Sequence, residues 1–181
     1  MSKFSNTTRE KFYFSLQGFT IIEMVIIFGI LMIISGTLIT SLHTGEQQIA
    51  LFTEQARIIS VISRAKSLSI ATFGQAGVVP CGFGVHFEAP NFLIFKDLAD
   101  NCQDADRIFK YSEPNEIYES FQLDPRVVFY SVSLTDIDFI PPNPTIVITP
   151  DQAEATIILK TANGNNSAVI KVNRAGQIST Q

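Results

Sequence analysis

The sequence predicts an α+β fold in which a long N-terminal helix packs on a domain of antiparallel β-strands. An apolar run without any charged residue covers 24–44, and helical periodicity continues through 47–72. After residue 73 the pattern changes to short β-type runs bounded by Gly, Pro, Asn and Asp. A helix followed only by strands that are mostly joined as hairpins is typical of the α+β class.

The first half of this helix, 19–44, is predicted to span a membrane. At about 1.5 Å per residue, the uncharged run gives a helix about 31 Å long, which is enough to cross a bilayer. Glu23 lies a few residues inside the apolar sequence. A carboxylate at that depth costs roughly 2.5 kcal/mol or more, so we expect Glu23 to be a functional residue with a cationic partner.

The segment before the apolar run, 1–18, is a short polar leader with three basic residues and one acidic residue. A secretory signal would have a 7–15-residue apolar core and then a small-residue cleavage site. Here the run is too long and no Ala-x-Ala follows it. Cleavage between Gly18 and Phe19 would instead leave the apolar helix on the mature chain, with a new α-amino group on Phe19.

The second half of the helix, 45–73, is predicted to be amphipathic and to pack on the sheet. Apolar residues recur at three- and four-residue steps, which is the stripe of a helix with one buried face. The predicted stripe consists of Ile49, Phe52, Ala56, Ile59, Ile62 and Ala65. The predicted opposite face consists of Glu46, Glu54, Arg57, Arg64 and Lys66.

The remaining residues, 74–181, are predicted to form one exported β-rich domain. Nine short runs have strand character. They are 82–87, 92–96, 108–111, 120–123, 127–133, 145–149, 155–159, 168–172 and 177–179. The turn at 162–166 contains Asn163-Gly164, which readily supplies the positive φ of a tight hairpin.

The segment 18–23 resembles the class III signal of type IV prepilins and type II secretion pseudopilins. Its glycine, phenylalanine and threonine are followed by two isoleucines and a glutamate, and a basic leader precedes them. The resemblance implies cleavage by a prepilin peptidase after Gly18 and methylation of the new N-terminal Phe19. It also implies that Glu23 pairs with the Phe19 amine of a neighbouring subunit in a filament.

The β-rich part resembles the GspH/FimT-type minor pseudopilin domain. The similarity rests on 84–87, 92–97, 116–119 and the closing segment 170–178. The chain departs from the common glycine-arginine pair of that family, because an alanine and a glycine follow Arg174. A minor filament subunit is the role that this resemblance implies.

Cys81 and Cys102 flank the first predicted hairpin. An exported domain meets an oxidising compartment in many bacteria, so a structural disulfide is predicted, with about 3 kcal/mol of stabilisation in the chain-entropy model. A pair of free buried thiols is the alternative. Zinc is not expected, because no histidines stand at suitable spacing.

An acidic loop follows the second predicted strand and carries Asp97, Asp100, Asp104 and Asp106. Their spacing fits no EF-hand, so a solvated loop is expected, with calcium as the alternative. No metal and no cofactor is therefore predicted. His86 lacks any nucleophile signature around it, and the sequence contains no phosphate-binding glycine loop or metalloprotease motif, so a membrane-tethered enzyme is not expected.

The expected function is a structural one. The chain is predicted to be a minor pseudopilin or pilin that assembles into an inner-membrane-rooted type II secretion pseudopilus or type IV pilus. Its partners would be other pilin-like subunits, the prepilin peptidase, the inner-membrane assembly platform and, through one span, the membrane. A plain single-pass anchor is the alternative reading of the N-terminal segment.

A second functional hypothesis is DNA binding for uptake, with Lys171 and Arg174 as the candidate contacts. Without the leader, 10 of the 13 basic and 16 of the 17 acidic residues remain, a net charge of about −6. Nucleic-acid binding needs clustered cations, so nucleic acid is not the expected partner. The positive-inside rule places the leader in the cytoplasm and the C-terminal domain outside it, anchored in the inner membrane.

Overall fold

The structure is a computed structural model that describes residues 20–72, 80–142 and 145–181. The chain divides into two compact units, Met1–Leu42 and His43–Gln181. Helix α1 (Ile21–Thr72) contributes to both units. The boundary between the units lies two residues before the predicted end of the first half of the helix.

The predicted fold class is wrong. Its defining element is a long helix with a transmembrane first half and an amphipathic second half that packs on one antiparallel sheet. No helix within the described ranges is both long and apolar enough to cross a membrane. Helical side chains are described over 21–37 and 45–72. The rest of the structure consists mainly of antiparallel strands in two sheets.

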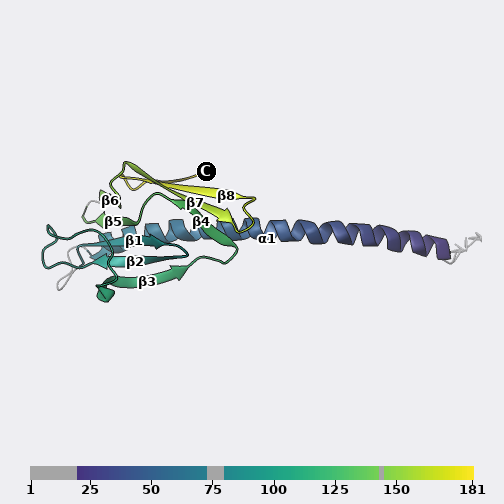
Figure 1. Cartoon of the computed structure of the whole chain (residues 1–181), viewed down its shortest axis with the longest axis horizontal. Coiled ribbons are helices and arrows are strands. Elements are labelled where there is room, and N and C mark those ends of the chain that lie inside the picture. The colour runs from purple at the N-terminus through teal and green to yellow at the C-terminus, as the bar shows by residue number, and fades with distance from the viewer. Residues whose placement is uncertain (1–19, 73–79, 143–144) are drawn as a thin grey trace, which may run out of the picture. The chain divides into compact units, whose positions relative to one another are not determined.

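The strands are divided between two antiparallel sheets, both within the second unit (Figure 1). In spatial order, the five-stranded sheet consists of β3 (Ile117–Gln122), β2 (Asn91–Asp97), β1 (Gly82–Glu88), β5 (Asp136–Ile140) and β6 (Thr145–Thr149). The four-stranded sheet consists of β4 (Val127–Val132), β7 (Glu154–Thr161), β8 (Ser167–Asn173) and β9 (Ile178–Thr180). A short 3-10 helix, η1 (Pro114–Glu116), leads into β3.

Eight of the nine predicted strands overlap observed ones, and the predicted strand at 108–111 is wrong. That segment belongs to the connection between β2 and η1. The prediction also missed β5, whose sequence DIDFI alternates aspartates with apolar residues. Both aspartates of β5 are buried and each pairs with a basic side chain, so these polar residues are part of the packing of the strand.

Glycines allow two tight features of the β-rich unit. A Cβ on Gly84 of β1 would lie 2.3 Å from Cζ of Phe95 and 2.5 Å from the carbonyl oxygen of Ile137, so only glycine fits between these neighbours. Gly164 has a φ of +76° in the turn between β7 and β8, which confirms the predicted Asn-Gly hairpin.

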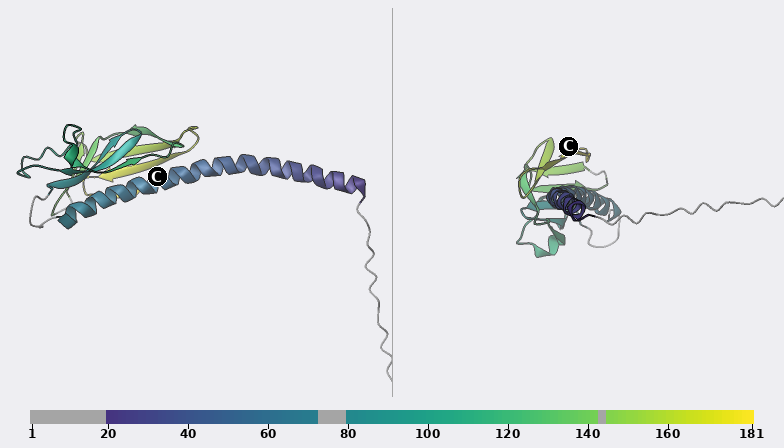
Figure 2. Two further views of the ribbon diagram at one scale, coloured as in Figure 1. Left: turned by 90° about the horizontal axis from the view of Figure 1, so that it is seen from below. Right: turned by 90° about the vertical axis from the view of Figure 1, so that its right-hand side faces the viewer.

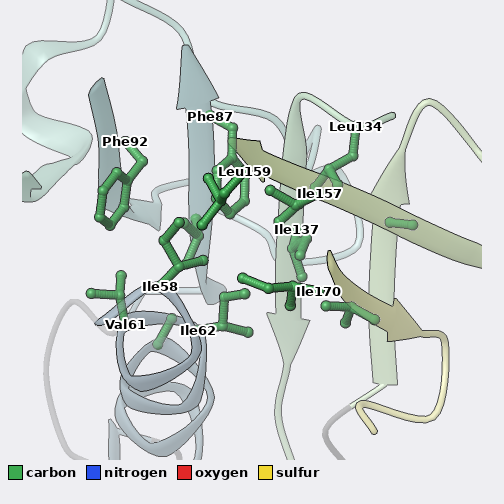
Figure 3. Close-up of a cluster of buried hydrophobic side chains, with 14 of the residues drawn as sticks. Ile58, Val61, Ile62, Phe87, Phe92, Leu134, Ile137, Ile157, Leu159 and Ile170 are labelled. Atoms are coloured by element: carbon green, nitrogen blue, oxygen red, sulfur yellow. The ribbon is translucent and has the colours of Figure 1, made fainter. Parts of the chain in front are cut away.

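The part of α1 within the second unit packs one face on both sheets, which lie against the same side of it (Figure 2). Ile58, Val61 and Ile62 meet side chains from both sheets in one hydrophobic core, among them Ile137 and Leu159 (Figure 3). Burial of each large apolar side chain on this face contributes roughly 1.5 to 3 kcal/mol to stability.

The predicted stripe on this helix is partly wrong. Ile62 and Ala65 are buried as expected, whereas Ile49 and Phe52 expose 68% and 54% of their surface. Glu54, which was assigned to the polar face, is buried instead. The helix has apolar residues on two faces, so periodicity alone did not identify the one that contacts the sheets.

Candidate functional site

The first candidate site is Glu23, in the first turn of α1. Its backbone N–H donates to Oγ1 of Thr20 at 3.4 Å, so Thr20 caps the start of the helix. Glu23 is exposed, and the flanking Ile22 and Met24 expose 66% and 44% of their surface. The structure therefore places a single carboxylate in an apolar, accessible surface.

The helical stretch that follows Glu23 presents apolar side chains in every direction. Each of its large hydrophobic residues between 21 and 34 is exposed, and the set is Ile21, Ile22, Met24, Val25, Ile26, Ile27, Phe28, Ile30, Leu31, Met32, Ile33 and Ile34. A helix that is apolar all round is normally covered by other apolar groups. This stretch is therefore the strongest candidate in the first unit for a contact surface.

The predicted cleavage and methylation positions, Gly18 and Phe19, lie outside the residues that the structure describes. Both remain predictions from the sequence.

The predicted disulfide between Cys81 and Cys102 is confirmed, and it joins the start of β1 to the loop after β2. The two Cα atoms are 5.1 Å apart, which is an ordinary separation for a disulfide. The backbone N–H of Cys81 also donates to the carbonyl of Asp97 at 2.8 Å. The bridge fixes the acidic loop after β2 to the start of β1.

The sequence analysis missed Arg107, which ties this loop to the sheet. Its Nη1 lies 3.3 Å from Oδ2 of Asp138 and 3.4 Å from Oδ2 of Asp97. The same guanidinium donates to the carbonyls of Cys81 at 3.0 Å and Cys102 at 2.6 Å. Arg107 itself has a φ of +62°, a left-handed backbone conformation that is uncommon outside glycine.

The carboxyl groups around Arg107 outnumber their cation. Asp97, Asp138 and Glu116 are all buried. Burial raises the pKa of Asp138 to about 7, with a further contribution from the nearby Asp97 and an opposing one from Arg107. Burial also raises the pKa values of Asp97 and Glu116. These carboxyls are therefore protonated more readily than ordinary ones, and the contacts of Arg107 join the loop to the sheet.

The acidic loop does not form a metal site among the residues that the structure describes, where no group of three His, Cys, Asp or Glu residues could hold a metal ion. Three of its aspartates each have a partner of their own within the chain. Asp97 points to Arg107, Asp106 pairs with Lys110, and Oδ2 of Asp104 accepts from the Asn101 amide at 3.0 Å.

The two candidate DNA contacts lie on and just after β8, and each already has an acidic partner. Nζ of Lys171 is 3.3 Å from Oε1 of Glu154, and Arg174 pairs with Asp151. These exposed pairs cancel the positive charge that would neutralise phosphates. The arrangement gives no support to a basic nucleic-acid surface at this position.

His86 lies on β1 with Nδ1 2.8 Å from Oδ1 of Asp136, an oxygen that also accepts from the backbone N–H of Phe109 at 3.2 Å. Its Nε2 is 3.9 Å from Glu88, whose carboxylate accepts a hydrogen bond from Tyr111. The histidine is therefore held in a polar network at the border between β1 and β5.

No family model, curated protein or solved structure matches the chain. The functional assignment therefore rests on the residues and the geometry of the chain itself.

Proposed function

We propose that the chain is a minor pseudopilin or pilin subunit that assembles into a filament rooted in the inner membrane, in a type II secretion system or a type IV pilus. The observation that carries the proposal is the helical stretch 21–34, which exposes apolar side chains on all sides and begins with one carboxylate, Glu23. The signal-like segment 18–23 supports the same reading, since it resembles the cleavage site of prepilins.

Packing of these helices from neighbouring subunits would cover the exposed apolar surface. Each large side chain that becomes fully buried contributes roughly 1.5 to 3 kcal/mol. Several such residues per turn favour assembly to the extent that their side chains leave water for the contact. Apolar contacts of this kind do not fix how far one helix is shifted along its axis relative to its neighbour. Another feature must therefore set the register of the two helices.

Glu23 is the group that can set the register. A carboxylate enclosed by apolar side chains is strongly destabilising unless a cation neutralises it. Cleavage after Gly18 would create an α-amino group on Phe19, and methylation would leave that amine cationic. In this proposal the Phe19 amine of a neighbouring subunit pairs with Glu23, and only one helix stagger brings the two charges together.

The β-rich domain fits a location outside the cytoplasm. Its disulfide, Cys81–Cys102, is the kind of bond that persists in oxidising compartments. The proposal assigns the leader to the cytoplasmic side, where the peptidase and the assembly platform would act on it. The role is structural, in assembly of the filament, and involves no reaction carried out by this chain.

The first test is incorporation of Glu23→Ala into filaments. Loss of one member of a buried ion pair costs about 3 to 5 kcal/mol, so the fraction of the variant in sheared filaments should fall at least about tenfold. Asp151→Ala is the matched control, because it also removes an exposed carboxylate but lies in the C-terminal domain. Normal incorporation of Glu23→Ala would refute the ion-pair mechanism.

The second test is the intact mass of the cellular protein. The proposal expects a chain that begins at Phe19 and carries one added methyl group. A protein that still begins at Met1, in cells with an active prepilin peptidase, would overturn the assignment to this class of subunit.

A further inference from the structure

The turn between β7 and β8 carries an Asn-Gly pair, Asn163-Gly164, at the surface of the domain. Both residues are exposed, and a Cβ placed on Gly164 would meet nothing within 4 Å. An asparagine that precedes glycine is open to an intramolecular reaction, because glycine has no side chain that shields its backbone nitrogen. The turn therefore brings a carboxamide and an unshielded backbone nitrogen together.

The side chain of Asn163 is held at both of its polar atoms. Oγ1 of Thr161 donates to Oδ1 of Asn163 at 2.6 Å, and the backbone N–H of Asn165 donates to the same oxygen at 3.2 Å. Nδ2 of Asn163 donates to Oε1 of Gln47. Because Thr161 is only 1% exposed, its hydroxyl is a fixed anchor for the carboxamide.

The contact with Gln47 fastens the hairpin to helix α1 within the second unit. Gln47 and Asn163 are 116 residues apart in sequence, so only the folded domain brings them together. A separate backbone contact, from the N–H of Ala162 to the carbonyl of Arg126 at 2.8 Å, ties the hairpin to the turn between β3 and β4. Loss of the Gln47 contact alone therefore frees the Asn163 side chain and leaves the hairpin attached to the domain.

The backbone nitrogen of Gly164 is restrained as well. Its N–H donates to the carbonyl of Thr161 at 2.7 Å, and Gly164 has a φ of +76°. While this hydrogen bond is intact, the nitrogen keeps its proton and faces Thr161 rather than Cγ of Asn163. Reaction between the two groups therefore requires that the turn opens and that the carboxamide leaves its partners.

We propose that Asn163 is a deamidation site that Gln47 holds closed in the folded domain. When the turn opens, the nitrogen of Gly164 gives its proton to hydroxide and attacks Cγ of Asn163. The new N–Cγ bond closes a succinimide ring, the Cγ–Nδ2 bond breaks, and Nδ2 takes a proton from water and leaves as ammonia. Water then cleaves one of the two ring C–N bonds and leaves aspartate or isoaspartate at position 163.

The reaction would release the hairpin tip from α1. Both products carry a carboxylate in place of the carboxamide, so the donor to Oε1 of Gln47 is lost. Isoaspartate also lengthens the backbone by one atom, which the short turn does not accommodate. The extent of modification therefore records how often the hairpin has opened. The inference concerns the folded domain and does not depend on filament assembly.

The test is ageing of the purified full-length chain in detergent at mildly alkaline pH, followed by trypsin digestion in mild acid. Trypsin releases residues 161–171, which contain Asn163, Asn165 and Asn166, and chromatography with mass spectrometry separates the asparagine, aspartate and isoaspartate forms. A synthetic peptide of residues 161–171 is the reference for the open turn. The folded chain should react at Asn163 first, about tenfold to a hundredfold more slowly than the peptide, because several hydrogen bonds must open.

Variants of Gln47 test the contact with the helix and leave the turn sequence unchanged. Gln47→Ala should speed deamidation of the folded chain about two- to tenfold, on the scale of one lost hydrogen bond. Gln47→Glu keeps an acceptor for Nδ2 and should react no faster than the wild type. Gln48→Ala is the matched control, because it shortens the exposed glutamine next to Gln47 and should leave the rate unchanged. Circular dichroism before ageing establishes that each variant is folded.

The proposal is overturned if the folded chain deamidates as fast as the peptide, or if it gives no product while the peptide is fully converted. It is also overturned if Asn165 or Asn166 reacts before Asn163, if Gln47→Ala leaves the rate unchanged, or if Gln47→Glu accelerates the reaction as Gln47→Ala does. Release of the hairpin is measured by hydrogen exchange. The amides of residues 161–166 should exchange faster in the modified fraction than in the unmodified chain, and equal exchange would refute the release.

Discussion

Replacement of Asp138 by asparagine tests the buried ionic cluster around Arg107. Burial raises the pKa of Asp138 from an ordinary value of 3.8 to about 7. Between these two pH values the folded protein holds a proton that the unfolded chain has lost. The unfolded state therefore binds fewer protons, and the free energy of unfolding falls as pH rises through this window.

The size of the effect follows from the shift. Each pKa unit is worth about 1.4 kcal/mol, so a shift of about three units corresponds to at most about 4 kcal/mol between pH 4 and pH 8. Asparagine has nearly the shape of a protonated aspartate and carries no charge. Asp138→Asn should therefore match the wild type near pH 4 and become more stable than it by about 2 to 4 kcal/mol at pH 8.

The assay is denaturant unfolding of the full-length chain in detergent at several pH values, for wild type and Asp138→Asn in parallel. Because both proteins share every other titrating group, their difference reports on Asp138 together with its coupling to Asp97 and Arg107. Asp151→Asn removes an exposed carboxylate and should change stability by less than about 0.5 kcal/mol at either pH. A stability difference between wild type and Asp138→Asn that does not change with pH would refute this account of the cluster.

Three further changes test the packing of the β-rich domain. Replacement of Cys81 and Cys102 by serine should lower the free energy of unfolding by about 3 kcal/mol, and an unchanged denaturation midpoint would contradict a stabilising bridge. Gly84→Ala should cost about 1 to 3 kcal/mol, because its Cβ would lie 2.3 Å from the Phe95 ring, and a neutral effect in the same assay would show that β1 can move away. Ile62→Ala should cost about 2 to 5 kcal/mol, since Ile62 is only 1% exposed in the core, and a loss below 1 kcal/mol would place it outside the core.

The β-rich part was largely predictable because its strands alternate and its turns carry strong local signals. Asn163-Gly164 is one such signal, and the hairpin around it was placed correctly. β5 was not predictable in the same way. It contains Asp136 and Asp138, and only the positions of His86 and Arg107 in three dimensions explain why two aspartates are buried in a strand.

The helix shows the limit of periodicity. Its uncharged N-terminal run was read as a membrane span, and no helix in the described part of the chain meets the requirements for one. Further along, Ile49 and Phe52 have the spacing of a buried stripe but are exposed, whereas Glu54 is buried. A sequence with apolar residues on two helix faces does not specify which face the sheets will cover.

The candidate site, like the fold, was only partly predictable from the sequence. The Cys81–Cys102 bridge could be predicted, because a sequence with two cysteines allows one pairing within the chain. Arg107 could not, since its partners are 10 and 31 residues away in sequence and become neighbours only when β5 pairs with β1. Local patterns carry little information about ion pairs that depend on such distant strand pairing.

The order of strands in the two sheets has a consequence for synthesis and folding. The chain enters the four-stranded sheet at β4, returns to the five-stranded sheet for β5 and β6, and then crosses again for β7 to β9. β4 consequently lacks its hydrogen-bonded neighbour until β7 has emerged from the ribosome. Neither sheet is a separable folding module, so fragments truncated before 161 would leave unpaired strand edges prone to aggregation, and the domain is expected to fold late and as one cooperative unit.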